Sequence, residues 1–195
     1  MIPLVDKLTA IIDIETTEAT LADARGTFPE IVEIAAITVN SEYEIQDTFT
    51  MVVQPSNMDD FTEFSHEFTG IKYATVREAP LWKDCWKEFA QFVGYNRCRI
   101  ISWGAPFDFG VLKTSYGRIG VGWPHKYPFI DAISIAYQIS REYGMDFGSW
   151  KLKSVCERLG LPVEGRHRAT GGAHACFNVL KELSTLDETN SDISL

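Results

Sequence analysis

Two carboxylates alternate along a short apolar run near the start of the chain. Asp13 and Glu15 flank Ile14 at the end of the run LTAIIDIE (8–15). Because successive strand residues point to opposite faces, both carboxylates would lie on one face of the predicted strand. Hard oxygen donors on one face suit Mg²⁺ or Mn²⁺. The alternative is that both acids are exposed at the strand end or neutralised by a lysine, since an unpaired buried carboxylate is costly.

Two more side chains further along the chain could take part in the same chemistry. Asp108 follows a predicted strand (99–103) and a Gly/Pro turn, where it opens a helix. It is either a helix cap or an acid aimed at metal-bound water from the carboxyl edge of the sheet. His167 precedes the last predicted helix in a basic loop flanked by glycines. A lone histidine is more often structural than catalytic, so its role depends on its neighbours.

The elements that must position these residues alternate in type. β-rich apolar runs predict four strands, at 8–15, 31–39, 48–53 and 99–103, and the short polar link 40–42 predicts antiparallel pairing of the second and third. Apolar residues at helical spacing predict helices after Pro80, from Asp108 to Tyr116, and at 131–143, 150–159 and 169–183. This order predicts a single α/β domain with a mixed central sheet and helical layers. A polar loop at 18–30 is placed to rim an active site.

Composition excludes several classes of protein. The chain of 195 residues has 45% hydrophobic residues, which is typical of a globular domain rather than a disordered one. Its formal net charge of −9 argues against a protein that coats nucleic acid through a broad basic surface. The four cysteines are scattered without metal-binding spacing, and no signal peptide or membrane-spanning run is present. These features predict a cytoplasmic protein.

Three ordered motifs resemble the DEDDh branch of the DnaQ-like 3′–5′ exonucleases, within the ribonuclease H-like superfold. They are IDIETT (12–17), WGAPFDFGVL (103–112) and HRA (167–169). The runs FPEIVEIAA (28–36) and FTGI (68–71) are similar to those of ERI-type and KapD-like members. The resemblance covers residues 8 to 183 and implies a ribonuclease H-like mixed sheet flanked by helices. We therefore assign residues 1–186 to one exonuclease domain and 187–195 to a polar, acidic tail.

The resemblance implies a role for each acid and for the histidine. Asp13 would bridge two divalent cations, Mg²⁺ or Mn²⁺, and Glu15 would help to hold the ion that activates water. Asp108 would support the second ion. His167 would be the general base that deprotonates the attacking water. Two ions about 3.5–4 Å apart would then stabilise in-line displacement at the phosphate.

The same resemblance implies a partner and a set of binding residues. The partner would be a single-stranded 3′ end, with RNA favoured over DNA, and no membrane is involved. The backbone around Ile14 and Thr16 would cradle the terminal nucleotide. Thr69, Trp103 and Phe107 would flank its base or sugar. For Trp103 and Phe107, packing in the core is at least as common a fate as stacking on a base.

The last motif departs from the family pattern at one position. The fourth metal ligand should come five residues after His167, where the chain has Gly172. The apolar stripe of the following helix is intact, with Cys176 one turn later, so the alignment is not shifted and position 172 should face inward. Neither His174 nor Asp131 is placed to replace the missing carboxylate.

Three explanations are open for this glycine. The site binds metal weakly, with water in place of the carboxylate and Mn²⁺ favoured over Mg²⁺; or the domain is an inactive pseudo-exonuclease that binds nucleic acid or a protein; or a one-base change has replaced an aspartate codon. The first predicts a metal-dependent exonuclease with reduced or abolished activity. The second predicts a binding module without turnover.

Overall fold

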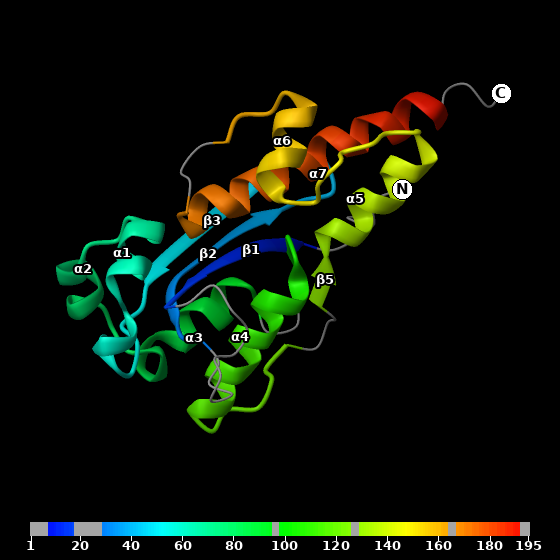
Figure 1. The fold of residues 1–195 in the computed structure, drawn as a ribbon. Helices are drawn as coiled ribbons and strands as arrows, with labels where there is room; N and C mark the ends of the chain where they lie inside the picture. The colour runs from blue at the N-terminus through cyan, green and yellow to red at the C-terminus, as the bar shows by residue number, and fades with distance from the viewer. Residues whose placement is uncertain (1–7, 18–28, 95–97, 126–128, 164–166, 192–195) are drawn as a thin grey trace.

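A mixed five-stranded sheet lies at the centre of the protein (Figure 1). The structure is a computed structural model that describes residues 8–17, 29–94, 98–125, 129–163 and 167–191. The strands are β1 (Thr9–Thr16), β2 (Ile31–Val39), β3 (Ile45–Val52), β4 (Arg99–Ser102) and β5 (Phe129–Asp131), in the spatial order β3-β2-β1-β4-β5. The pairs β1–β2 and β2–β3 are antiparallel, whereas β1–β4 and β4–β5 are parallel. The predicted mixed sheet, with antiparallel second and third strands, is confirmed.

Helices cover both faces of this sheet. Figure 1 shows α6 and α7 on one face and α3 and α4 on the other. The helices are α1 (Glu63–Thr69), α2 (Tyr73–Glu78), α3 (Trp82–Phe92), α4 (Ala105–Arg118), α5 (Ala132–Glu142), α6 (Leu152–Leu159) and α7 (Ala169–Ser191), with a 3₁₀ turn at Met58–Asp60. In the described ranges, none of these helices has the length and hydropathy needed to cross a membrane.

Alternation along β1 assigns its side chains to two separate cores. Ile12 and Ile14 pack with residues of α3 and α4. Ile11 packs with residues of α5, α6 and α7 on the opposite face. Asp13 and Glu15 have the parity of Ile11, so their carboxylates emerge on the face that α7 covers. The period-2 pattern of one strand therefore places both acids beneath the last helix.

Several element boundaries differ from the prediction for identifiable reasons. Helix α4 begins at Ala105 rather than Asp108, because Gly104 adopts a left-handed N-cap conformation (φ 84°) and Pro106 fits the first turn. Strand β5 was not predicted, since three residues give no readable alternation. Helix α7 continues past the predicted end at residue 183, so the tail predicted for 187–195 begins inside a helix. Most of the predicted polar loop, residues 18–28, and residues 192–195 lie outside the described residues.

Candidate active site

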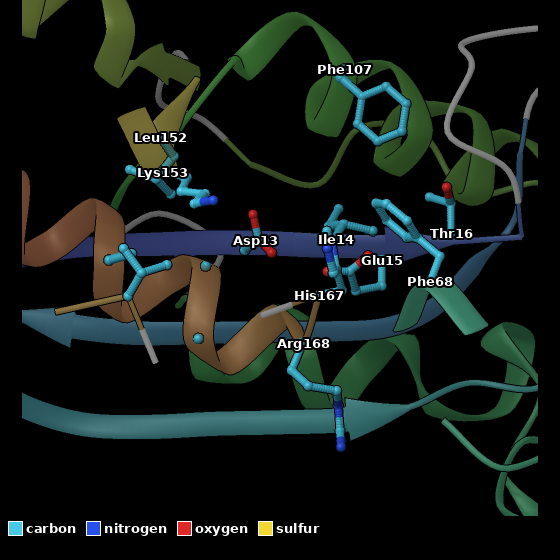
Figure 2. Close-up of a pocket in the computed structure, with 14 residues that line it drawn as sticks. Asp13, Ile14, Glu15, Thr16, Phe68, Phe107, Leu152, Lys153, His167 and Arg168 are labelled. Carbon is cyan, nitrogen blue, oxygen red and sulfur yellow. The ribbon is translucent and has the colours of Figure 1, made fainter. Parts of the chain in front are cut away.

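A pocket of about 500 Å³ opens where β1 passes beneath the start of α7 (Figure 2). The structure brings most of the predicted site residues to its wall: Asp13, Ile14, Glu15, Thr16, Phe107, His167 and Gly172. They come from β1, the first turn of α4 and the N-terminal end of α7. The sequence motifs are thus neighbours in space as well as ordered in sequence.

Asp108, the remaining predicted acid, does not line this pocket, but its charge acts on Asp13. It is in the first turn of α4 and only 3% exposed, and the N-cap of that helix is Gly104. Asp108 is therefore not the cap, which removes the simpler interpretation of this acid. Burial raises the pKa of Asp108 to about 7, and the charge of Glu15 contributes to the increase. Hydrogen bonds with the Ser102 side chain and with the backbone at Ile14 and Asp108 itself act in the opposite direction and lower this pKa.

The three acids influence one another electrostatically. Burial raises the pKa of Asp13 well above its ordinary value, and the neighbouring carboxylates, Asp108 first, raise it further. Burial also raises the pKa of Glu15 to about 7, with Glu33 adding to the effect and Arg168 opposing it. Within the described residues, no lysine or arginine forms an ion pair with Asp13, Glu15 or Asp108. Neutralisation by a neighbouring basic side chain is thus not seen.

Such a cluster has the chemistry of a cation site but not its full ligand set. Raised pKa values mean that the carboxylates are harder to ionise in this site. A bound divalent ion would favour the ionised form of each carboxylate and so would lower these pKa values. However, in the described part of the chain no three His, Cys, Asp or Glu side chains are arranged so that together they could hold a metal ion. The oxygen donors fit Mg²⁺ or Mn²⁺ in kind. They would have to converge further to bind one.

The Asp13 carboxylate fills the space beside Gly172. A Cβ atom added to Gly172 would lie 2.5 Å from Cγ and 2.8 Å from Oδ1 of Asp13, and closer still to Oδ2. Real Cβ atoms do not approach other heavy atoms below 3.0 Å. The Asp13 carboxylate therefore occupies the space that any larger side chain at position 172 would need. Position 172 does face inward, as the helical register predicts.

His167 lines the pocket in an unusual backbone conformation. Its φ is 57°, in the left-handed region that a residue with a Cβ enters at a cost of roughly 1–2 kcal/mol. Its ring packs against Phe68 of α1, with ring centroids 4.1 Å apart at 42°. Figure 2 shows His167 beside Glu15 and Phe68 at the pocket. The imidazole is thus close to Glu15 of β1, while its packing contact comes from α1.

Two of the predicted binding residues do not reach the pocket wall. The indole N–H of Trp103 donates to the carbonyl of Trp150 at 2.8 Å, and the ring packs against the core beneath α7. Thr69 is 1% exposed, and its hydroxyl donates to the carbonyl of Ser65 at 2.7 Å at the end of α1. Both side chains therefore have structural partners. For Trp103, this agrees with the alternative of core packing rather than stacking on a base.

Other pocket residues lie in the runs FTGI and HRA and in the basic stretch near His167, but none of them was assigned an individual role from the sequence. Phe68 and Lys153 line the wall, and Arg168 lines it beside His167. Phe68 stacks on the exposed ring of Phe64 one turn earlier in α1, with centroids 5.8 Å apart at 18°. The sequence signal that could have identified Phe68 is its spacing of four residues from another aromatic residue, Phe64. Asp131, in contrast, is structural: its Oδ1 accepts from the N–H groups of residues 104, 105 and 133.

Known proteins resemble this chain over nearly its whole length. The DNA polymerase III PolC-type of Staphylococcus haemolyticus (strain JCSC1435) is 26% identical over 184 residues, which cover 92% of this chain and 12% of the polymerase. The corresponding polymerase of Staphylococcus aureus is 27% identical over 200 residues, which cover 98% of this chain and 13% of that polymerase. The chain therefore spans 12–13% of the length of these polymerases.

Solved structures share the fold at lower sequence identity. The complex of E. coli exonuclease I with a dT13 oligonucleotide superposes with a TM-score of 0.77 at 17% identity, covering 96% of this chain and 43% of that one. The nuclease domain of 3′hExo bound to rAMP, a DEDDh family member, gives 0.76 at 20% identity and covers 94% of both chains. The RNase_T family, described as exonucleases, matches residues 10–180. The chain has the ribonuclease H-like fold of DnaQ-like exonucleases and belongs to the RNase_T exonuclease family.

Proposed function

We propose that this chain is a divalent-metal-dependent 3′–5′ exonuclease for single-stranded ends, with activity reduced by Gly172. The observation that carries the proposal is one pocket that brings Asp13 and Glu15 of β1 together with His167, which precedes α7. A phosphodiester is anionic and would be repelled by these carboxylates alone. Hydrolysis in this pocket therefore needs a cation between acids and phosphate.

Each residue would have a distinct part in the reaction. Asp13, Glu15 and Asp108 would hold the cation, which supplies positive charge that stabilises the phosphate as its bond breaks. His167 would accept the proton of the attacking water at a ring nitrogen. The leaving 3′ oxygen belongs to the shortened strand, so the product is a mononucleotide.

The pocket walls would bind the terminal nucleotide. The backbone at Ile14 and Thr16 would hold the 3′ end, and the rings of Phe107 and Phe68 would flank its base. Base–aromatic stacking is worth about 1–3 kcal/mol and is tolerant of sequence. A pocket of about 500 Å³ suits one or two nucleotides rather than a longer segment. This favours an end-directed rather than an internal cut.

The sugar preference is proposed from the ERI-like runs, which favour RNA over DNA. The two solved relatives contain a DNA oligonucleotide in one case and a ribonucleotide in the other.

Parallel digestion of 5′-labelled single-stranded RNA and DNA, each with a free or a blocked 3′ end, tests the proposal. We expect ladders that shorten from the free 3′ end, Mn²⁺ outperforming Mg²⁺, and faster loss of RNA. Cleavage of 3′-blocked strands at internal positions would contradict an exonuclease.

A binding module without turnover is the second candidate function. The Asp13 carboxylate against Gly172 favours it, because in this arrangement Asp13 leaves no room for a fourth carboxylate at position 172. Lys153 also favours it, since its ammonium group lines the pocket and its pairing with Glu157, at 3.4 Å, is exposed. Exposed pairs of this kind contribute little, so Lys153 remains available to a phosphate. Tight end binding in EDTA with no product in Mn²⁺ would select this function.

A further inference from the structure

Glu33 is a completely buried acid that the proposed chemistry does not use. It lies in the middle of β2 with 0% of its surface exposed, directly opposite Glu15 of β1 in the antiparallel register. Fully buried glutamates are rare unless they are paired. Its partner lies 135 residues away in the chain, at the start of α7.

Arg168 and the backbone after it hold this carboxylate through several hydrogen bonds. Nε of Arg168 donates to Oε1 and Oε2 of Glu33 at 3.1 and 3.0 Å, and its terminal nitrogen donates to Oε1 at 2.5 Å. The backbone N–H of Ala169 donates to Oε2 at 2.8 Å. Glu33 thus binds a side chain and the first backbone N–H of α7 together. Two consecutive residues are fixed to the sheet by one carboxylate.

The residue immediately before this pair of anchors is His167. Its left-handed backbone is uncommon for a non-glycine residue, and such conformations persist only where the surroundings determine them. Figure 2 shows Arg168 pointing away from Asp13 while His167 stays at the pocket. Because consecutive side chains diverge here, fixing Arg168 to β2 directs the histidine ring to the other side. Phe68 then supports that ring at 4.1 Å.

We infer that Glu33 and Arg168 are positioning residues that set the orientation of the His167 ring over the pocket. This inference rests on the proposed function only for the role of His167 as general base. The bidentate geometry requires the planar guanidinium fork, which lysine lacks although it keeps the charge. Residue 168 thus determines how well the neighbouring base is aimed.

The test compares Arg168→Lys with Arg158→Lys, a matched control. Arg158 is an exposed arginine of α6 that does not line the pocket. The primary readout is the ring resonance of His167 in ¹H–¹³C spectra, where the face of Phe68 shifts it. His66, His125 and His174 serve as internal references in the same spectrum. We expect the His167 signal alone to move or broaden in Arg168→Lys, and no histidine signal to move in Arg158→Lys.

A second readout is kinetic and uses Mn²⁺-supported digestion. Misplacing a reacting group by about 1 Å costs up to about 100-fold in rate, so we expect kcat to fall at least about tenfold with KM within about twofold. Glu33→Gln, which keeps an acceptor for the Ala169 N–H, should shift the same His167 signal in a folded protein. An unchanged His167 signal in both variants would overturn the inference even if digestion proceeds. If neither the chain nor Gly172→Asp digests any strand, the proposed exonuclease fails, and the spectra still decide on the positioning.

Discussion

Position 172 gives the sharpest test of the packing at the site. Gly172→Ala adds one carbon to α7, and in an unobstructed helix this change stabilises by about 1 kcal/mol. Here the new Cβ would overlap the Asp13 carboxylate, with Cγ only 2.5 Å away. Such overpacking costs about 1–3 kcal/mol, because the acid must rotate into the pocket. We therefore expect Gly172→Ala to be destabilised by about 0–2 kcal/mol in EDTA.

The matched control is Gly117→Ala, near the end of α4. A Cβ there meets nothing within 4 Å, and the residue is exposed. It should be neutral or stabilise by up to about 1 kcal/mol. For a chain of this length, the two variants should then differ by several degrees in Tm, since 1 kcal/mol corresponds to about 2–4 °C. Differential scanning fluorimetry in EDTA measures the difference.

Added Mn²⁺ extends the same test to the metal. If a cation draws Asp13 away from Gly172, the deficit of Gly172→Ala should shrink or vanish as Mn²⁺ is added. Gly172→Asp should be still less stable in EDTA, because it adds a carboxylate to a cluster of raised pKa. In saturating Mn²⁺, Gly172→Asp should become more stable than Gly172→Ala. Equal stabilisation by Gly172→Ala and Gly117→Ala in EDTA would refute the contact between Asp13 and Gly172.

Three other changes test separate parts of the site. The pKa of Asp108 is raised from 3.8 to about 7, so this group favours folding below pH 4, and its contribution is lost as pH rises through 7. At about 1.36 kcal/mol per pKa unit, the loss in unfolding free energy is up to about 4 kcal/mol. Chemical unfolding of Asp108→Asn in EDTA should show less loss of stability between pH 5 and 8 than the parent chain, and an equal loss would contradict the buried acid. Lys153→Gln should flatten the salt dependence of oligonucleotide binding in EDTA by about 0.7 in log–log slope, and Lys151→Gln, which does not line the pocket, should leave it unchanged; similar slopes for both variants would exclude a specific phosphate contact. Asp131→Ala removes an acceptor shared by three N–H groups and should lower the unfolding free energy by about 1–3 kcal/mol, whereas a neutral result would refute its capping role.

Much of the site could be predicted because its determinants are local. Alternation along β1 put Asp13 and Glu15 on one face, and the apolar stripe after Gly172 fixed the register of α7. Both depend on the periodicity of a single element. In the structure Gly172 faces Asp13, since a Cβ added to Gly172 would meet the Asp13 carboxylate.

The remaining features depend on contacts between distant segments. Nothing near Glu33 in the sequence identifies Arg168 as its partner. The motif around Trp103 could not show that its indole bonds to Trp150 rather than to a ligand. The position of the Asp13 carboxylate in the space beside Gly172 reflects side-chain packing in three dimensions, which no sequence period encodes. These are the points at which the metal ligands and the binding surface departed from expectation.

Digestion of 5′-labelled single-stranded RNA in Mn²⁺ by three proteins tests the central claim most directly. The panel consists of this chain, Gly172→Asp and Asp13→Ala, each first shown to be folded. We predict slow 3′–5′ shortening by this chain, faster shortening by Gly172→Asp and none by Asp13→Ala. Undiminished shortening by Asp13→Ala, or none by either of the other two proteins, would contradict a metal-dependent exonuclease site in this pocket.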